Sequence, residues 1–328
     1  MSDQLREPVL SLRDLRVGFD TPNGIVQAVR GVDVDLHAGE ILGVVGESGS
    51  GKSVTFLGVL GLLPKSARIT GSAKVNGVEM VGASTNTMRS VRGRQVSMIF
   101  QDPLSALNPV HRVGDQIVEM IRSHQDVSKK SAAATAIDLL GTVGIPQPKD
   151  RTNQYPHEFS GGMRQRVMIA MAIANDPQVL IADEPTTALD VTVQAQVLEL
   201  MGELRQRLGM AMVIITHDLG VVATHTDKIA VMYGGEVVEI APTKELFANM
   251  RHPYTEALMK SIPRLDRAPG ERMPAIAGTP PDPVAERVGC AFAARCAYAT
   301  DKCHKEHPEL TDAGNGHAYR CFFPLGGK

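Results

Sequence analysis

The sequence predicts an α/β fold with one large domain, a helical insert within it and a small irregular extension at the C-terminus. An apolar run, "ILGVV" (residues 41–45), precedes a glycine-rich loop and then a helical pattern. A second apolar run, "VLIA" (residues 179–182), ends in two acidic residues. Between these runs, about residues 103–165 have helical spacing, and from about residue 262 the chain is rich in proline and glycine. Strands that alternate with helices are typical of an α/β fold.

Composition and length narrow the class of protein. The chain has 328 residues, of which 43% are hydrophobic and 21% charged, as in ordinary soluble domains. The net charge of −2 gives no basic balance that would attract nucleic acid. The N-terminus has no secretion signal, and the longest apolar stretches span about ten residues, whereas a spanning helix needs about 20. We therefore expect a cytoplasmic protein that does not cross a membrane and forms no disulfides.

The other elements follow in order along the chain. Short β-like runs alternate with turns over residues 9–45. In the insert, two helical patterns precede an expected loop, "IPQPKDRTNQYPHEF" (residues 145–159). Strand patterns return at "QVLIADEP" and "AMVIITHD", with a helical pattern between them. Residues 228–241, "KIAVMYGGEVVEIA", predict a hairpin with a Gly-Gly turn.

The stretch "GESGSGKS" (residues 46–53) fits a phosphate-binding loop between a strand and a helix. Its glycines let main-chain N–H groups approach phosphate oxygens, and the helix N-terminus favours an anion. Lys52 would contact the β- and γ-phosphates, and the Ser53 hydroxyl would bind Mg²⁺. The residues expected to bind nucleotide here are Gly46, Ser48, Gly49, Ser50, Gly51, Lys52 and Ser53.

The two acids after "VLIA" complete this chemistry. Asp183 would hold Mg²⁺ through water, and Glu184 would orient or deprotonate the attacking water. A strand that ends in solvated acids is the alternative, and it loses weight beside the phosphate-binding loop.

A second anion-binding pattern occurs in "FSGGMRQR" (residues 159–166). Ser160, Gly161 and Gly162 stand just before a helical pattern. Because one nucleotide needs only one such loop, the simplest explanation is a head-to-tail dimer in which each loop faces the partner's Ser-Gly-Gly turn. A plain helix N-cap formed by Ser160 is the alternative.

These motifs carry a family resemblance. "GESGSGKS", "FQDP", "FSGGMRQR", "LIADEPTTALD" and "ITHD" have the order and spacing of ABC-type ATPases. The resemblance implies an ABC nucleotide-binding domain over residues 1–245, with a helical subdomain over about residues 103–165. It also implies ATP and Mg²⁺ as ligands.

The resemblance implies roles for further residues. Gln101 resembles the residue that lies close to Mg²⁺ and the water, next to the transporter contact, and His217 resembles the one that contacts the γ-phosphate. Asp190 lies in a segment that would cross the dimer interface, and Phe19 resembles the aromatic residue that stacks on adenine. The signature departs from its usual form at Phe159, where Leu is usual, and at Met163, where Gln is usual; the second change removes a polar side chain near the phosphates.

All four cysteines lie near the C-terminus, at Cys290, Cys296, Cys303 and Cys321. No C-x₂-C pair occurs, which disfavours a zinc ribbon. Four thiols in a poorly packed tail still suit an iron–sulfur cluster or zinc, because a metal site would add folding energy. Unligated thiols are the alternative. Nearby His304, His307 and His317 could replace a ligand, but we expect them to be surface residues.

The C-terminal part, residues 246–328, resembles the extension of the ATPase subunits of dipeptide and oligopeptide permeases, and in particular the first of their two paired ATPases. The similar stretches are "RHPYTEALMKSIP", "AGTPPD" and "GCAFAARCAYATDKCHKEHPEL". This resemblance implies a [4Fe–4S] cluster on the four cysteines. It also implies an ATPase that powers peptide uptake, lying peripherally on the cytoplasmic face of the inner cell membrane.

The partners implied are a second, paralogous ATPase, two transmembrane permease subunits and an extracytoplasmic peptide-binding protein, with no nucleic acid. Relatives that serve nickel, glutathione or similar solutes have a similar extension, so the solute stays open. A soluble ABC ATPase that acts on ribosomes or DNA is the alternative function. Such proteins usually have two cassettes or a long coiled-coil insert, and this chain has neither.

Overall fold

The computed structural model describes residues 7–102, 106–187, 189–261 and 276–326. The chain divides into two compact units, each built from separate stretches of sequence. The first unit contains Met1–Leu10, Asp35–Ile41 and Lys74–Ile215, and the second contains Ser11–Val34, Leu42–Ala73 and Thr216–Lys328.

The first unit contains three parallel strands whose carboxyl ends lie together. They are β6 (Val96–Ile99), β7 (Val179–Asp183) and β8 (Ala211–Ile215), with β7 in the middle. Ala182 of β7 pairs with Ile99 on one side and Ile214 on the other. All five residues of β7 are buried, which explains its uninterrupted apolar run, since a central parallel strand is covered on both faces.

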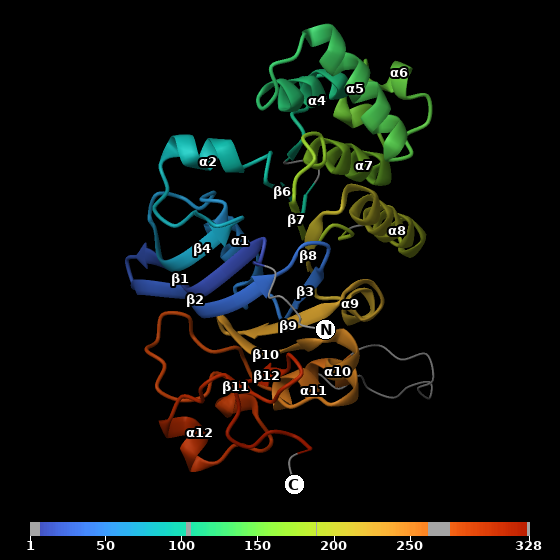
Figure 1. Cartoon of the computed structure of the whole chain (residues 1–328). Coiled ribbons are helices and arrows are strands. Elements are labelled where there is room, and N and C mark those ends of the chain that lie inside the picture. Colours follow the sequence, from blue (N-terminus) through green and yellow to red (C-terminus); the bar gives the residue numbers. More distant parts are fainter. Residues whose placement is uncertain (1–6, 103–105, 188, 262–275, 327–328) are drawn as a thin grey trace. The chain divides into compact units, whose positions relative to one another are not determined.

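The predicted helical insert forms a group of helices in this unit (Figure 1). They are α4 (Val113–Arg122), α5 (Lys129–Thr142), α6 (Pro148–Arg151), the 3₁₀ turn η1 (Pro156–Glu158) and α7 (Gly161–Ala172). The expectation of a loop over residues 145–159 is wrong, because this stretch contains α6 and η1. Proline near the start of each accounts for this: its fixed φ suits a first helical turn, which has no need of its N–H.

Three further elements of the first unit complete its framework. They are α2 (Thr85–Val91), α8 (Val191–Leu208) and β5 (Val78–Glu79), whose Glu79 pairs with Lys74 at the end of β4.

The second unit contains most of a sheet in which β2 (Gly24–Leu36), β1 (Leu10–Thr21) and β4 (Ala67–Val75) are neighbours in that order. Its other strands are β3 (Ile41–Val45), β9 (Lys228–Tyr233), β10 (Glu236–Pro242), β11 (Thr311–Asp312) and β12 (Ala318–Tyr319), in the order β11-β12-β10-β9-β3. Strand β3 and the β9–β10 hairpin lie where the sequence predicts them.

The helices of the second unit are short. They are α1 (Lys52–Val59), α9 (Leu219–His225), α10 (Thr243–Ala248), α11 (Pro253–Lys260), η2 (Ala293–Arg295) and α12 (Asp301–Lys305). The prediction of an α/β fold is confirmed.

The C-terminal extension packs against the second unit's core, so the expectation of a poorly packed tail is wrong. Phe292, between two of the cysteines, is 3% exposed and lies 5.3 Å, ring to ring, from both Tyr233 and Tyr254. Strand β12 pairs antiparallel with β10, with Ala318 opposite Ile240. Aromatic packing of this kind stabilises a core beyond the area that it buries. The predicted domain boundary between residues 245 and 246 stays a prediction.

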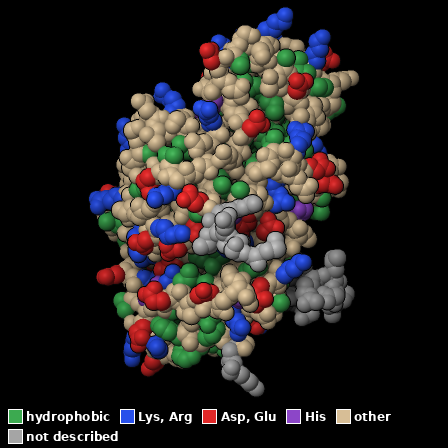
Figure 2. Space-filling model, in the orientation of Figure 1, with side chains coloured by type: hydrophobic (Ala, Val, Ile, Leu, Met, Phe, Trp, Pro, Cys, Tyr) green, Lys and Arg blue, Asp and Glu red, His purple; other side chains and the backbone are tan. Residues whose placement is uncertain are grey.

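Within the described residues, no helix has the length and apolar character needed to span a bilayer. Figure 2 shows Lys and Arg side chains interspersed with Asp and Glu side chains over the visible face.

Candidate functional site

The phosphate-binding loop runs from the end of β3 to the start of α1 and needs glycine at two positions. Gly51 is the N-cap of α1 with φ +97°, and a Cβ there would lie 2.5 Å from the carbonyl oxygen of Ala28. Gly46 has φ +153°, and a Cβ there would collide with the carbonyl oxygen of Met232. Only glycine combines this backbone conformation with such close approaches.

The loop lysine points back into the loop. Lys52 is 6% exposed, and its Nζ donates to the carbonyl oxygens of Gly46 at 2.8 Å and Glu47 at 3.0 Å. The Oγ of Ser50 lies 3.5 Å from the same nitrogen. A buried ammonium held by carbonyl dipoles is a point charge ready to meet phosphate oxygens.

A pocket of about 390 Å³ opens beside this loop. This volume lies within the range of small-molecule sites. One wall comes from the loop and β2, and the other from the extension. The lining residues are Val26, Gln27, Ala28, Glu47, Ser48, Gly49, Ser50, Gly51, Val54, Tyr233, Gly234, Pro280, Pro281, Pro283 and Arg287. The proline-rich stretch, expected to be a linker, therefore forms part of the wall.

The acidic end of β7 brings two predicted site residues together in the first unit. Because β6 and β7 are parallel neighbours, Gln101 follows β6 at the edge where Asp183 and Glu184 follow "VLIA". The Nε2 of Gln101 donates to Oε2 of Glu184 at 2.8 Å, and Oγ1 of Thr187 donates to the same oxygen at 2.8 Å. Asp183 is 6% exposed. The sequence gave no signal for the contact of Thr187.

Glu184 has an unusual backbone. Its φ is +46°, in the left-handed region that a non-glycine residue rarely adopts. Its N–H donates to the carbonyl oxygen of Ile215 at 2.9 Å, which fixes this conformation. Strained backbone that the surroundings hold in place is common at functional sites.

The Ser-Gly-Gly turn of the first unit starts α7. Ser160 is the N-cap, and its Oγ accepts a hydrogen bond from the N–H of Met163 at 3.4 Å, while Gly161 and Gly162 are already helical. The capping alternative is therefore confirmed, and anion binding at this turn stays a prediction. Asp190 has a similar role, since its Oδ1 accepts from the N–H of Val193 at 3.0 Å and caps α8.

The remaining predicted residues belong to the second unit. Phe19 lies on β1 and is half-buried, and His217 is exposed in the segment before α9. Ser53 follows Lys52 in the first turn of α1. Their roles stay predictions.

All four cysteines line one small pocket in the second unit. Its other lining residues are His252, Pro253, Phe292, Ala293, Tyr298, Pro308, Phe322 and Phe323. Burial raises the pKa of Cys290 and Cys296, and raises that of Cys321 to about 11. The N–H two residues after each of these cysteines opposes this shift; that of Tyr298 lies 3.4 Å from Sγ of Cys296. A metal ion or cluster would have to displace protons from these thiols.

The pocket's size and donors bear on what it holds. Its volume is about 20 Å³, close to the space of one water molecule, so a four-iron cluster would require the thiols to move apart. Among the described residues, no group of three or more His, Cys, Asp and Glu side chains is arranged to hold a single metal ion. The donor set, four thiols and no carboxylate, suits an iron–sulfur cluster.

The histidines near the cysteines have other partners. His307 lies 3.1 Å from Glu236, and Nε2 of His317 lies 2.8 Å from Oε1 of Glu239. His317 is 2% exposed and Glu239 is fully buried, so the expectation that all three histidines are surface residues is wrong for His317. His304 is exposed, as expected.

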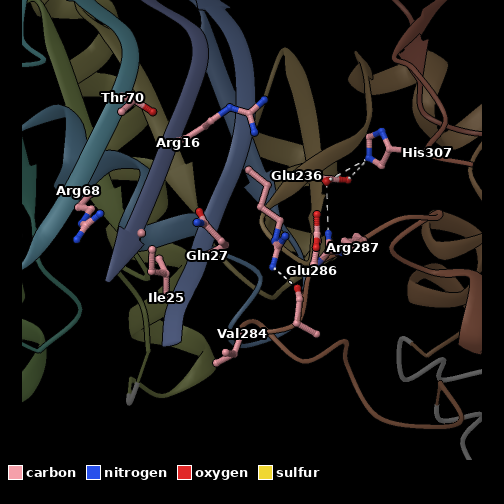
Figure 3. Close-up of a pocket in the computed structure, with 13 residues that line it drawn as sticks. Arg16, Ile25, Gln27, Arg68, Thr70, Glu236, Val284, Glu286, Arg287 and His307 are labelled. Carbon is pink, nitrogen blue, oxygen red and sulfur yellow. Dashed lines mark hydrogen bonds and ion pairs between the residues drawn. The ribbon is translucent and has the colours of Figure 1, made fainter. Parts of the chain in front are cut away.

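A larger pocket of about 790 Å³ lies between the sheet and the extension of the second unit (Figure 3). Arg30 donates to the carbonyl oxygens of Pro283 at 3.0 Å and Ala285 at 3.1 Å. Glu236 pairs with His307 and, at 3.4 Å, with Arg287. Burial opposes ionisation of Glu236, but the hydrogen bond to His307 and the nearby arginines lower its pKa overall. These contacts attach the extension to β2 and β10.

Comparisons with known proteins agree with this arrangement. The profile of the family described as ABC transporter matches residues 29–187, and that of the oligopeptide/dipeptide transporter C-terminal region matches residues 238–303. The chain is 49% identical over 318 residues to the dipeptide transport ATP-binding protein DppD of Bacillus subtilis, covering 96% of this chain and 95% of that protein. It is 46% identical over 325 residues to the oligopeptide transport ATP-binding protein OppD of Escherichia coli, covering 99% and 96%.

A solved structure shares the fold. It is a dimeric ATP-binding cassette in a post-hydrolysis state with ADP and phosphate bound. The TM-score is 0.64 at 24% identity, over 71% of this chain and 98% of that chain.

Proposed function

Because the chain belongs to the ATP-binding subunits of the oligopeptide and dipeptide ABC transporter family, we propose that it hydrolyses ATP to power uptake of dipeptides or oligopeptides through a membrane importer. The observation that supports catalysis most directly is the Glu184 carboxylate, which Gln101 and Thr187 hold at the end of β7. A carboxylate fixed in this way can accept the proton of an attacking water. Relatives that serve nickel or glutathione-like solutes leave the solute as the less certain part of the assignment.

The residues then have distinct tasks. Lys52 exchanges the carbonyl oxygens of the loop for phosphate oxygens when ATP binds. Ser53, Gln101 and Asp183 would hold Mg²⁺, which neutralises charge on the phosphates. Glu184 takes the proton from water, and His217 contacts the γ-phosphate.

The other predicted residues serve binding and assembly. Phe19 stacks on adenine. The turn from Ser160 to Met163 meets the nucleotide of a partner ATPase, and Asp190 lies at that interface. The change from Gln to Met163 leaves Ser160, Gly161 and Gly162 in place, so we propose that the turn still binds phosphate.

The proposed assembly has a second, paralogous ATPase, two transmembrane permease subunits and an extracytoplasmic peptide-binding protein. The chain would lie peripherally on the cytoplasmic face of the cell membrane. Closing of the ATP-bound dimer and its opening after hydrolysis would move the permease, a shift driven by different nucleotide affinities of the two states.

Co-purification tests this assignment. The tagged Glu184→Gln chain is isolated from its own cells with ATP in mild detergent, and mass spectrometry identifies what accompanies it. Two multi-span permeases and a second ATPase are the expected result, and a peptide-binding protein would identify the solute class. Ribosomal proteins or DNA-repair factors in their place would favour the soluble alternative.

We also propose that Cys290, Cys296, Cys303 and Cys321 bind a [4Fe–4S] cluster. The support is that the four thiols line one pocket although Cys321 lies far along the chain from the others. The cluster would supply four covalent links that join these segments. Phe292 already attaches this region to the core, so its loss would loosen the region rather than release it.

Metal analysis of protein purified without oxygen tests the cluster. Four iron and four sulfide per chain, with broad visible absorption, are expected. Cys303→Ser should lose this iron, while His304→Ala, a change at the exposed neighbour of Cys303, should retain it. Stoichiometric zinc without iron would replace the cluster by a zinc site.

A further inference from the structure

An arginine of the cysteine-containing segment grips the phosphate-binding loop. Arg295 lies next to Cys296, at the end of the η2 turn, and its side chain is 4% exposed. Its guanidinium contacts the Glu47 carboxylate through both branches, at 2.6 Å to Oε2 and 3.0 Å to Oε1. A two-bond pairing of this kind fixes direction as well as distance.

Glu47 is the second residue of "GESGSGKS", and each of its polar groups is engaged. Its carboxylate receives Arg295, and its N–H donates to the hydroxyl of Tyr254 at 2.9 Å. Its carbonyl oxygen accepts from Nζ of Lys52 at 3.0 Å. Two residues from the last quarter of the chain therefore fix the residue that in turn holds the phosphate-binding lysine.

Arg295 is itself immobilised. It donates to the hydroxyl of Tyr233 at 3.1 Å and to the carbonyl oxygens of Ile276 at 3.0 Å and Ala277 at 2.9 Å. Its guanidinium lies 5.7 Å from the ring centre of Tyr233, which packs against Tyr254 at 4.5 Å. Both tyrosines are almost fully buried, so the guanidinium has a rigid support.

We propose that Arg295 is a positioning residue for ATP binding, which holds Glu47 so that the phosphate-binding loop keeps its nucleotide-ready conformation. A loop already ordered in its bound conformation gives up less entropy when the ligand arrives. The extension is then a part of the nucleotide site. This inference depends neither on the cluster nor on the transported solute.

Two weaker explanations predict different behaviour. An exposed ion pair contributes little, but this pair is mostly buried, and the guanidinium makes further hydrogen bonds. A pair that only attaches the extension would change the stability of the protein, yet leave the ATP affinity of folded molecules unaltered.

Titration of the purified full chain with a fluorescent ATP analogue separates these explanations. Arg295→Gln should weaken binding about tenfold, since the loop must order itself without its charged partner. Arg295→Lys should recover part of the affinity, because lysine restores the charge but not the fork. Arg320→Gln is the matched control: Arg320 also belongs to the extension, and its hydrogen bonds go to the carbonyl oxygens of Val237 and Pro308.

Steady-state ATP hydrolysis by the assembled transporter gives a second readout. Arg295→Gln should raise KM for ATP about tenfold and change kcat by less than about twofold, because Arg295 supports binding and not the chemical step. In a double-mutant cycle, Glu47→Gln with Arg295→Gln should be no weaker than the worse single variant.

A folded Arg295→Gln protein with normal ATP affinity and KM would overturn the proposal, even if it melts at a lower temperature. If that variant does not fold, Glu47→Gln takes its place, and unchanged affinity there would overturn the proposal as well. Because ATP affinity is measured on the chain itself, an error in the importer assignment leaves this result interpretable.

Discussion

Gln101 and Glu184 are 83 residues apart in the sequence, yet Nε2 of the first donates to Oε2 of the second at 2.8 Å. The parallel pairing of β6 and β7 creates this relationship, because it brings the ends of both strands to one edge. Glu184 also has a left-handed backbone, with φ +46°. The carboxylate is thus aimed by two side chains and by its own main chain.

Replacing this carboxylate should separate binding from chemistry. Glu184→Gln keeps the size of the side chain and removes the base, so we expect kcat to fall by about 10²- to 10⁴-fold while ATP binding persists. Phosphate release and binding of a fluorescent ATP analogue measure the two properties. Glu203→Gln, a change at an exposed position of α8, is the control. Hydrolysis by Glu184→Gln at the normal rate would exclude Glu184 as the base.

The phosphate-binding loop offers a test of steric need. Gly51 and Gly39 both have positive φ, at +97° and +75°, but only at Gly51 would a Cβ approach another atom closely. Gly39→Ala should cost about 1 kcal/mol of folding free energy through backbone strain alone. Gly51→Ala should cost more and abolish ATP binding. Urea denaturation with nucleotide titration checks both, and similar behaviour of the two variants would contradict the steric argument.

Glu239 joins the extension to the core and should be important for stability. It is fully buried, and it accepts from the N–H groups of Arg251 at 2.6 Å and His252 at 2.9 Å while contacting His317. Glu239→Ala leaves these donors unpaired, so we expect a loss of about 3–5 kcal/mol of unfolding free energy. Glu309→Ala, at an exposed position, should change it by less than about 0.5 kcal/mol. Urea denaturation measures both, and equal effects would refute this role.

His252 should make the protein sensitive to acid. Burial lowers its pKa to about 3, from an ordinary value of 6.5. The unfolded chain therefore binds a proton that the folded protein does not, and this contribution to stability, present above pH 6.5, is lost as pH falls toward 3. His252→Asn keeps a capping side chain for the N–H of Tyr254 and cannot be protonated in this range.

The comparison of slopes checks this effect. Between about pH 4 and pH 6, the unfolding free energy of His252→Asn should fall less steeply, by up to about 1.4 kcal/mol per pH unit. Urea denaturation at several pH values measures the slopes, and parallel slopes for both proteins would show that His252 is not responsible.

Local signals account for what the sequence predicted well. The strand before "GESGSGKS", the strand "VLIA" and the Gly-Gly hairpin depend on neighbouring residues, so their patterns are visible in short windows. The contact of Gln101 with Glu184 agrees with the proximity that the family resemblance implies for these motifs.

Other features depend on residues far apart, and no local pattern encodes them. Arg295 and Glu47 are 248 residues apart, and neither stands out within its own segment. The burial of His317 likewise depends on Glu239, 78 residues earlier. The helix α6 was missed for a different reason: proline was taken as a loop signal, although it also suits the first turn of a helix.

The pairing of β12 with β10 has a consequence during synthesis. Tyr319 lies opposite Glu239, and the N–H of Arg320 donates to the carbonyl oxygen of Val238 at 2.8 Å. Until the ribosome has released these last residues, β10 is an uncovered strand edge, the kind of surface on which unfinished chains pair with one another. A ribosome that stalls shortly before residue 318 would therefore leave a nearly complete chain that is prone to aggregate.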